Sequence, residues 1–260
     1  MSETAIRLSV FAGALLLFAA LETLFPARAR VLPRARRWVT NLSLSALGSV
    51  VGALMAPVLA VTVAAFAQAR GWGLLNVVEL HPALAFAIAF VALDFAVWAQ
   101  HVATHRVPLL WRLHKVHHTD RDLDVTSGVR FHPVEIGVSL LWKALVILAL
   151  GPSVLAVLVF EVVLNATALF THSNIALPPR VDRAVRRLFV TPDMHRIHHS
   201  VVERETNANF GFNLSVWDRI FRTYRADHEG ALQLGLLEHQ TDAPARLLSS
   251  LALPLQPPRR

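Results

Sequence analysis

Long apolar runs are the feature that most limits how this chain can fold. They occupy residues 6–25, 39–67, 82–99 and 134–168. An α-helix rises about 1.5 Å per residue, so roughly 20 apolar residues cross a hydrocarbon core about 30 Å thick. With 54% hydrophobic and 17% charged residues, the chain also has too little polar surface for a water-soluble protein. The sequence therefore predicts an all-α fold, a multi-pass bundle of membrane helices.

The individual runs carry further signals. The second run is expected to cross the membrane as one helix, tilted or kinked near Pro57. The fourth run is interrupted by Gly151 and Pro152, a pair typical of turns, so it is expected to form a hairpin of two helices. Each leg has about 17 residues, which permits either full crossings or a hairpin that enters the bilayer only partly.

The distribution of arginine predicts the orientation. Five arginines follow the first run, namely Arg28, Arg30, Arg34, Arg36 and Arg37, whereas residues 68–81 hold only Arg70. Loops rich in Lys and Arg stay in the cytoplasm, so the first loop is predicted to be cytoplasmic. Counting the crossings places residues 101–133 and the chain after His172 on that same side. A cleaved signal peptide is the alternative for the first run, although only Arg7 precedes its apolar core.

Histidine is concentrated in these polar segments. Eight of the 13 histidines lie in three five-residue strings, HVATH at 101–105, HKVHH at 114–118 and HRIHH at 195–199. Residues three and four apart share one face of a helix, so each string presents its imidazoles together. The eight candidate ligands are His101, His105, His114, His117, His118, His195, His198 and His199. Eight imidazoles exceed what one ion accepts, which favours two neighbouring metal ions.

The absence of cysteine narrows the chemistry of such a site. Without thiolates the chain forms no disulfide, no iron–sulfur cluster and no thiolate-ligated haem or zinc finger. Any bound metal must be held by nitrogen or oxygen. The net charge of +7 suits anionic lipid headgroups better than nucleic acid, because the chain is so apolar.

The order HxxxH, HxxHH, hairpin, HxxHH resembles the fatty acid hydroxylase and sterol desaturase superfamily of integral-membrane di-iron oxygenases. The resemblance covers about residues 94–224. It includes Asp94 and Trp98 before the first string, the motif FHPxE at 131–135 and Thr191-Pro192 before the third. NxNxG at 207–211 and the segment 217–224 resemble the closing motif of the family, with Arg222 where many members have glycine.

The resemblance implies two iron ions, dioxygen as co-substrate and a lipid substrate from the bilayer, such as a fatty acyl chain or a sterol-like lipid. It implies a catalytic domain over residues 81–225, preceded by N-terminal membrane helices (1–80). The tail (226–260) is expected to be loosely ordered, because it contains Pro244, Pro254, Pro257 and Pro258. The histidine strings would lie in a cytoplasmic helical cap. The residues do not distinguish hydroxylation from desaturation of the C–H bond.

Further polar residues are expected near the metals. His172 follows the hairpin and is predicted to be a ninth ligand, with Asn174 as a polar neighbour. Asp94 shares a helical face with His101 and His105 and is expected to accept a hydrogen bond from a ligand imidazole. An ion pair between Asp94 and Lys143 is the alternative, although Glu161 could equally pair with that lysine. Asn207 and Asp218 are expected near the third string, where capping and turn formation would also explain them.

Electrons must come from another protein, because the chain has neither cysteine nor a Gly-x-Gly-x-x-Gly fingerprint. A carrier of the ferredoxin or cytochrome type, with its reductase, is the expected partner. An arginine-rich segment offers it a basic surface or else contacts anionic lipid: Arg180, Arg183, Arg186, Arg187 and Arg196. The competing functions are a divalent-metal transporter, a bis-histidine cytochrome and a zinc protease, the last of which lacks its H-E-x-x-H motif.

Overall fold

The computed structural model describes residues 2–256, and every regular element in this range is a helix. The longer helices are α1 (Glu3–Leu24), α2 (Arg34–Leu54), α3 (Ala60–Arg70), α5 (Pro82–Arg106), α6 (Pro108–His118), α7 (Pro133–Leu150) and α8 (Val154–His172). The shorter α-helices are α4 (Leu74–Val77), α9 (Pro179–Val185), α10 (Pro192–His198), α11 (Glu203–Thr206), α12 (Val216–Ile220) and α13 (Leu247–Ala252). The 3-10 helices are η1 (Ala56–Val58), η2 (Val125–Val129), η3 (Leu237–His239), η4 (Ala243–Ala245) and η5 (Leu253–Leu255). The predicted all-α fold is confirmed.

Four helices are long and apolar enough to cross a membrane: α1, α5, α7 and α8. The predicted hairpin is confirmed as α7 and α8, joined at Gly151, whose φ of 68° lies in the left-handed region that glycine tolerates best. The core between the long helices is apolar and includes Val63, Leu93, Ile147 and Phe160. Between membrane helices these side chains contribute through close van der Waals packing, because the lipid around them is as apolar as the core itself.

The second apolar run corrects one expectation. Residues 39–67 do not form a single helix, because α2 ends at Leu54 and α3 starts at Ala60, with η1 between them. Pro57 lies in η1, and because proline has no backbone N–H it cannot donate the hydrogen bond that would continue an α-helix. Helix α2 also buries polar side chains, including Thr40 and Asn41, and is not among the four candidate spans.

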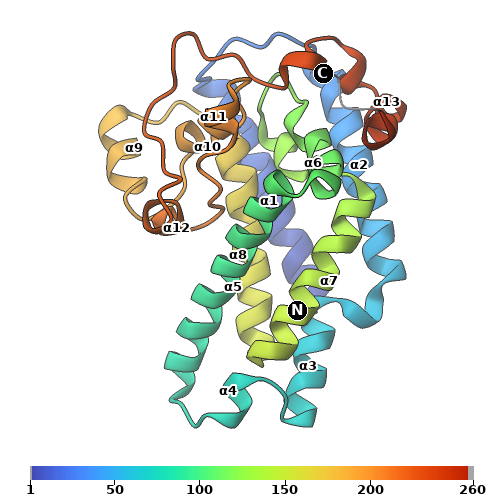
Figure 1. The fold of residues 1–260 in the computed structure, drawn as a ribbon, viewed down its shortest axis with the longest axis vertical. Helices are drawn as coiled ribbons and strands as arrows, with labels where there is room; N and C mark the ends of the chain where they lie inside the picture. The colour runs from blue at the N-terminus through green and yellow to red at the C-terminus, as the bar shows by residue number, and fades with distance from the viewer. Residues whose placement is uncertain (1, 257–260) are drawn as a thin grey trace.

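The short helices gather at one end of the long ones and form a cap (Figure 1). Helices α6 and α9 to α13 lie at this end, together with the loop between α1 and α2, while α4 lies at the opposite end. The arginine-rich first loop and the histidine strings therefore share one end of the bundle, as the count of crossings requires.

Buried ion pairs fasten the cap to α2. The guanidinium of Arg37 donates to Asp120 at 2.7 Å and to Asp124 at 2.5 Å, and both carboxylates are buried. Although burial opposes ionisation, this guanidinium holds the pKa of Asp120 well below its ordinary value. Three more of the arginines used to infer orientation also form ion pairs: Arg34 and Arg30 contact the buried Glu22 at 2.9 and 3.7 Å, and Arg36 contacts Asp242 at 3.5 Å.

The segment after residue 225 was expected to be loosely ordered, and residues 226–256 do not behave so. They form η3, η4, α13 and η5 and hydrogen-bond to earlier helices. Thr40 donates to the carbonyl of Ala245 at 2.7 Å, and Arg112 donates to the carbonyl of Pro254 at 2.8 Å. These contacts span more than 140 residues, so no local pattern reveals them. Residues 257–260 of the predicted tail lie outside the described range.

Candidate metal centre

Local sequence explains how each histidine string begins or ends a helix. HVATH forms the last turns of α5, and Pro108 then starts α6 in its first turn, so HKVHH follows at once. Thr191 caps α10 by accepting from the amide of Met194 at 3.3 Å, with Pro192 in the first turn. His172 is the last residue of α8. Four helices therefore deliver their histidines to one region of the cap.

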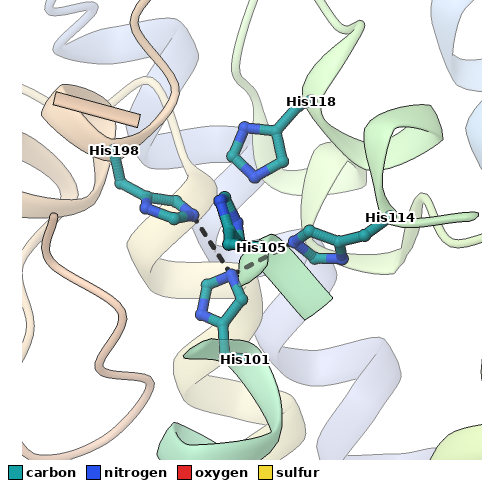
Figure 2. A group of neighbouring side chains, drawn as sticks. All are labelled: His101, His105, His114, His118 and His198. Carbon is teal, nitrogen blue, oxygen red and sulfur yellow. Dashed lines mark hydrogen bonds between the residues drawn. The ribbon is translucent and has the colours of Figure 1, made fainter. Parts of the chain in front are cut away.

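All nine predicted histidines lie together, in two groups. The first group comprises His101, His105, His114, His118 and His198, and the second comprises His117, His172, His195 and His199. Within each group the candidate ligand atoms lie within 4.8 Å of one another. Figure 2 shows the first group, whose rings from α5, α6 and α10 point toward a common centre. Each group mixes different strings, so neighbours in sequence such as His117 and His118 serve different groups.

The Nδ1 atoms define the protonation of several rings. In His101, His172 and His198 this atom lies 2.7–2.8 Å from the backbone carbonyls of Phe210, Ala168 and Ala208, respectively. His117 makes a similar contact of 3.3 Å with the carbonyl of Arg130. A carbonyl oxygen only accepts, so each Nδ1 must carry the proton and donate it. The Nε2 atom of each neutral ring is then left with a lone pair.

These lone pairs face one another at close range. His101 and His198 bring their Nε2 atoms to 3.1 Å, and His117 and His172 do the same at 3.1 Å. Two acceptors cannot hydrogen-bond, but a cation between them satisfies both. Metal–nitrogen bonds of about 2.1 Å meeting at roughly 90° separate two nitrogens by about 3.0 Å. The spacing therefore fits imidazoles that share a metal ion.

Buried ring nitrogens without hydrogen-bond partners also indicate a metal site. Among the described residues, no hydrogen bond reaches Nε2 of His105, either ring nitrogen of His118, or Nδ1 of His195 and His199. Burial also lowers the pKa of the cap histidines His117, His118, His195 and His199, and it lowers that of His198 to about 3. Neutral imidazole is the form that ligates metals.

Glu135 is the carboxylate that contacts a string histidine. Its Oε1 atom lies 2.6 Å from Nδ1 of His114, and its Oε2 atom is buried without a hydrogen-bond partner among the described residues. The side chain of His132 accepts a hydrogen bond from the amide of Val134 and so caps the start of α7. Glu135, in the first turn of α7, then reaches His114 on α6. The FHPxE motif contains this glutamate, but the spacing of the motif does not indicate which histidine the glutamate contacts.

Asp94 is placed differently from the expectation. Its carboxylate accepts from the indole of Trp217 at 2.8 Å and from the amide of Leu214 at 3.3 Å. Among the described residues no ligand imidazole hydrogen-bonds to it, and Lys143 pairs with Glu161 at 2.5 Å instead. Asp94 lies about two helical turns before His101 on α5, and at that level α5 contacts α12 through Trp217. Asp94 therefore bonds to α12 and not to a ligand imidazole.

Asp218 supports the site indirectly, by holding the loop that contacts His101. Its carboxylate accepts from the amides of Phe210 and Gly211 at 2.9 and 2.8 Å and from Trp98 at 3.1 Å. It therefore fixes the loop whose carbonyl, that of Phe210, receives the hydrogen bond from His101. Within the segment 217–224, Arg222 has a φ of 60°, in the left-handed region that glycine tolerates best.

The two predicted asparagines serve the backbone. Asn174 bonds to the backbone of Arg28 through both side-chain atoms, at 3.1 and 2.9 Å, and so joins the end of α8 to the first loop. Asn207 donates to the carbonyl of Glu203 at 3.0 Å at the end of α11. Asn207 therefore caps a helix, which was the alternative to a position near the metals.

Two cavities reach the histidines from different directions. The membrane-side cavity, of about 150 Å³, lies between α5, α7 and α8 and is lined by His101, His114 and Glu135. The cap-side cavity, of about 520 Å³, is lined by His105 and Trp111 together with Glu203 and Glu238. His105 is also the one member of the two groups that is not fully buried.

Comparison with known proteins agrees with this geometry. A family model described as fatty acid hydroxylase matches residues 86–223, just over half of the chain. Ornithine lipid hydroxylase OlsE of Rhizobium tropici is 30% identical over 137 residues, which are 53% of this chain and 40% of that protein. Alkylglycerol monooxygenase of Homo sapiens is 28% identical over 141 residues, 54% of this chain and 31% of that protein.

The matched region holds the three histidine strings, His172 and Glu135. This chain spans well under half the length of these relatives, and no solved structure matches it. The match to the family model over more than half of the residues, with the histidines assembled as described, identifies the family. The chain belongs to the fatty acid hydroxylase family.

Proposed function

We propose that this protein is a membrane-bound, non-haem di-iron oxidoreductase that uses dioxygen to hydroxylate or desaturate a C–H bond of a lipid. The observation that carries the proposal is the pair of histidine groups whose neutral Nε2 atoms face one another at about 3 Å. The relatives named above support it, because their names describe a lipid hydroxylase and a monooxygenase.

The two groups would each hold one iron ion. Two bound iron ions supply the oxidising power, through dioxygen, that no amino-acid side chain has for an unactivated C–H bond. The protein's contribution is to hold nine neutral imidazoles in place. Glu135 accepts the Nδ1 proton of His114 as a hydrogen bond, which fixes that ring and raises its basicity.

The membrane-side cavity would receive the substrate. It is lined by His101 and His114 at one end and by Ile136 and Leu164 from the membrane helices. The rings of Phe131 and Phe212 also line it, so they exclude water from the carbon that lies next to the histidines. Transport of a divalent metal gains no support, because the histidines gather in the cap rather than along a path through the bundle.

The cap side is proposed to face the cytoplasm, as the arginine-rich first loop favours. Hydroxylation by dioxygen forms one C–OH group and one water, and it consumes two protons and two electrons from a donor. The proposed donor is an external ferredoxin or cytochrome with its reductase. It would approach the cap-side cavity, where Trp111 lies 4.9 Å from the ring of His105 between centroids, or the arginine-rich surface of α9.

Isotope labelling tests the reaction. The full chain, purified with ferrous iron, is supplied with ferredoxin, its reductase, NADPH and a bacterial membrane lipid extract under ¹⁸O₂. We expect lipids that carry one ¹⁸O atom or have lost two hydrogens, and none with His101→Ala. The exposed His228 provides the matched control, because His228→Ala should retain turnover. Lipids unchanged in the presence of an iron-loaded, folded protein would reject the proposed reaction.

A further inference from the structure

The membrane-side cavity carries polar side chains that a site for pure hydrocarbon does not need. Gln100 from α5, Ser139 and Lys143 from α7, and Asn165 from α8 line it, all within helices long and apolar enough to span a membrane. Polar groups at such depth are costly unless they have partners or a function. Their convergence on the cavity that reaches His101 therefore calls for a ligand with a polar atom.

Asn165 is the member of this set with no bond to satisfy it. Asn165 is exposed and lines the cavity, and among the described residues it takes part in no hydrogen bond. Lys143 donates to Glu161 at 2.5 Å, and an ammonium group has three N–H donors, so further donors remain available. Gln100 and Ser139 bond to each other at 2.6 Å and so bridge α5 and α7 beside them.

The charges around Lys143 balance. Glu161 accepts from Arg7 at 2.8 Å as well as from Lys143, and Arg7 also pairs with Glu3 at 2.8 Å. Two acidic and two basic groups leave no net formal charge. A neutral oxygen therefore fits this end of the cavity better than a carboxylate or phosphate.

We propose that Asn165 and Lys143 form a subsite for a neutral oxygen of a lipid chain, namely a hydroxyl, ether or carbonyl oxygen. Lys143 follows Glu135 by eight residues on α7, which is about 12 Å along the helix axis. The subsite therefore selects chains with an oxygen roughly that far from the carbon that lies beside His101 and His114. The cavity of about 150 Å³ holds only that stretch of the chain, since sites for whole drug-sized ligands measure about 300 Å³ or more.

This subsite rests on the proposed function for its substrate, but its ligand preference can be measured without metal. Unlabelled 1-hexadecanol, hexadecane and palmitic acid compete against a fluorescent alkyl probe on the purified full chain in an uncharged detergent. One hydrogen bond is worth about 1 kcal/mol net, so hexadecanol should bind roughly 5- to 10-fold more tightly than hexadecane. Asn165→Leu breaks no bond of the described fold and should bring this ratio close to one.

Gln68→Leu is the matched control, because Gln68 is exposed on α3 and does not line the cavity. It should keep the wild-type ratio, whereas Lys143→Met should lower it. An unchanged ratio in the folded Asn165→Leu protein would overturn the subsite. Tightest binding by palmitate, lost in Lys143→Met, would replace the neutral oxygen by an anion and also overturn the proposal. A normal ratio in a protein that oxidises no lipid would instead reject the proposed reaction alone.

Discussion

In several histidines of the two groups, the residue that accepts the hydrogen bond from Nδ1 fixes the orientation of the ring. Backbone carbonyls do this for His101, His117, His172 and His198, and Glu135 does it for His114. The histidines themselves were predictable, because eight of them occur in three strings at helical spacing. Their orienting partners were not, since Phe210 and Ala208 lie in a loop without regular structure. Asp94 was expected near a ligand from its helical face alone, and the contact between Glu135 and His114 was not predicted, because it depends on how α7 packs against α6.

Glu135→Gln tests the orienting carboxylate. The amide keeps the size of the side chain but removes the charge that holds the proton on His114, so iron affinity should fall by about 10- to 100-fold. Iron retention during dialysis against a chelator of known affinity measures this. Asp94→Asn is the control, because Asp94 accepts hydrogen bonds from Trp217 and the backbone of Leu214, and this variant should retain iron. Equal retention by all three proteins would remove Glu135 from the site.

At the scale of elements, turn chemistry was readable and long-range packing was not. Gly151 and Pro152 predicted the hairpin of α7 and α8. Pro57 was expected only to kink a single helix, whereas α2 and α3 are separate helices on either side of η1. The chain after residue 225 was expected to be loosely ordered because of its four prolines in the last 17 residues. It is ordered by distant donors such as Arg130, which bonds to the carbonyl of Pro244 at 2.7 Å.

One glycine sets the distance between η2 and α8. A Cβ atom on Gly128 would lie 2.6 Å from the carbonyl oxygen of Ala168, which is backbone and cannot move aside cheaply. Gly128→Ala should lower the free energy of unfolding by about 1–3 kcal/mol through overpacking. Gly13→Ala in α1 is the control, because a Cβ there meets nothing within 4 Å, and it should be neutral or slightly stabilising. Thermal unfolding in one detergent compares them, and equal stability of both variants would contradict the close approach.

At the scale of the whole molecule, the cap converts separate strings into a centre with two entrances. The membrane-side cavity contacts His101 and His114, and the cap-side cavity contacts His105. The sequence predicted that these histidines share one end of the bundle. It could not predict how the strings divide between two groups, because that division depends on how α5, α6, α8 and α10 pack against one another.

The metal-free protein should be destabilised by acid. Histidines of the unfolded chain take up protons near pH 6.5, whereas burial lowers the pKa of His199 and lowers that of His198 to about 3 in the fold. The unfolded state therefore binds more protons below about pH 6.5, and stability falls as the pH decreases from 7.5 toward 4. Melting temperatures in the presence of a chelator should be lower at pH 5.5 than at pH 7.5. A melting temperature that is constant or higher at pH 5.5 would contradict the burial of neutral rings.

The number of iron ions per chain tests the central claim most directly. The full chain is purified anaerobically, loaded with ferrous iron, desalted and analysed for iron and protein by mass spectrometry and amino-acid analysis. The two histidine groups predict two iron ions per chain, with a loss of about one ion in His198→Ala from the first group and in His199→Ala from the second. A folded wild-type chain that retains one iron ion or none under these conditions would contradict a centre built for two.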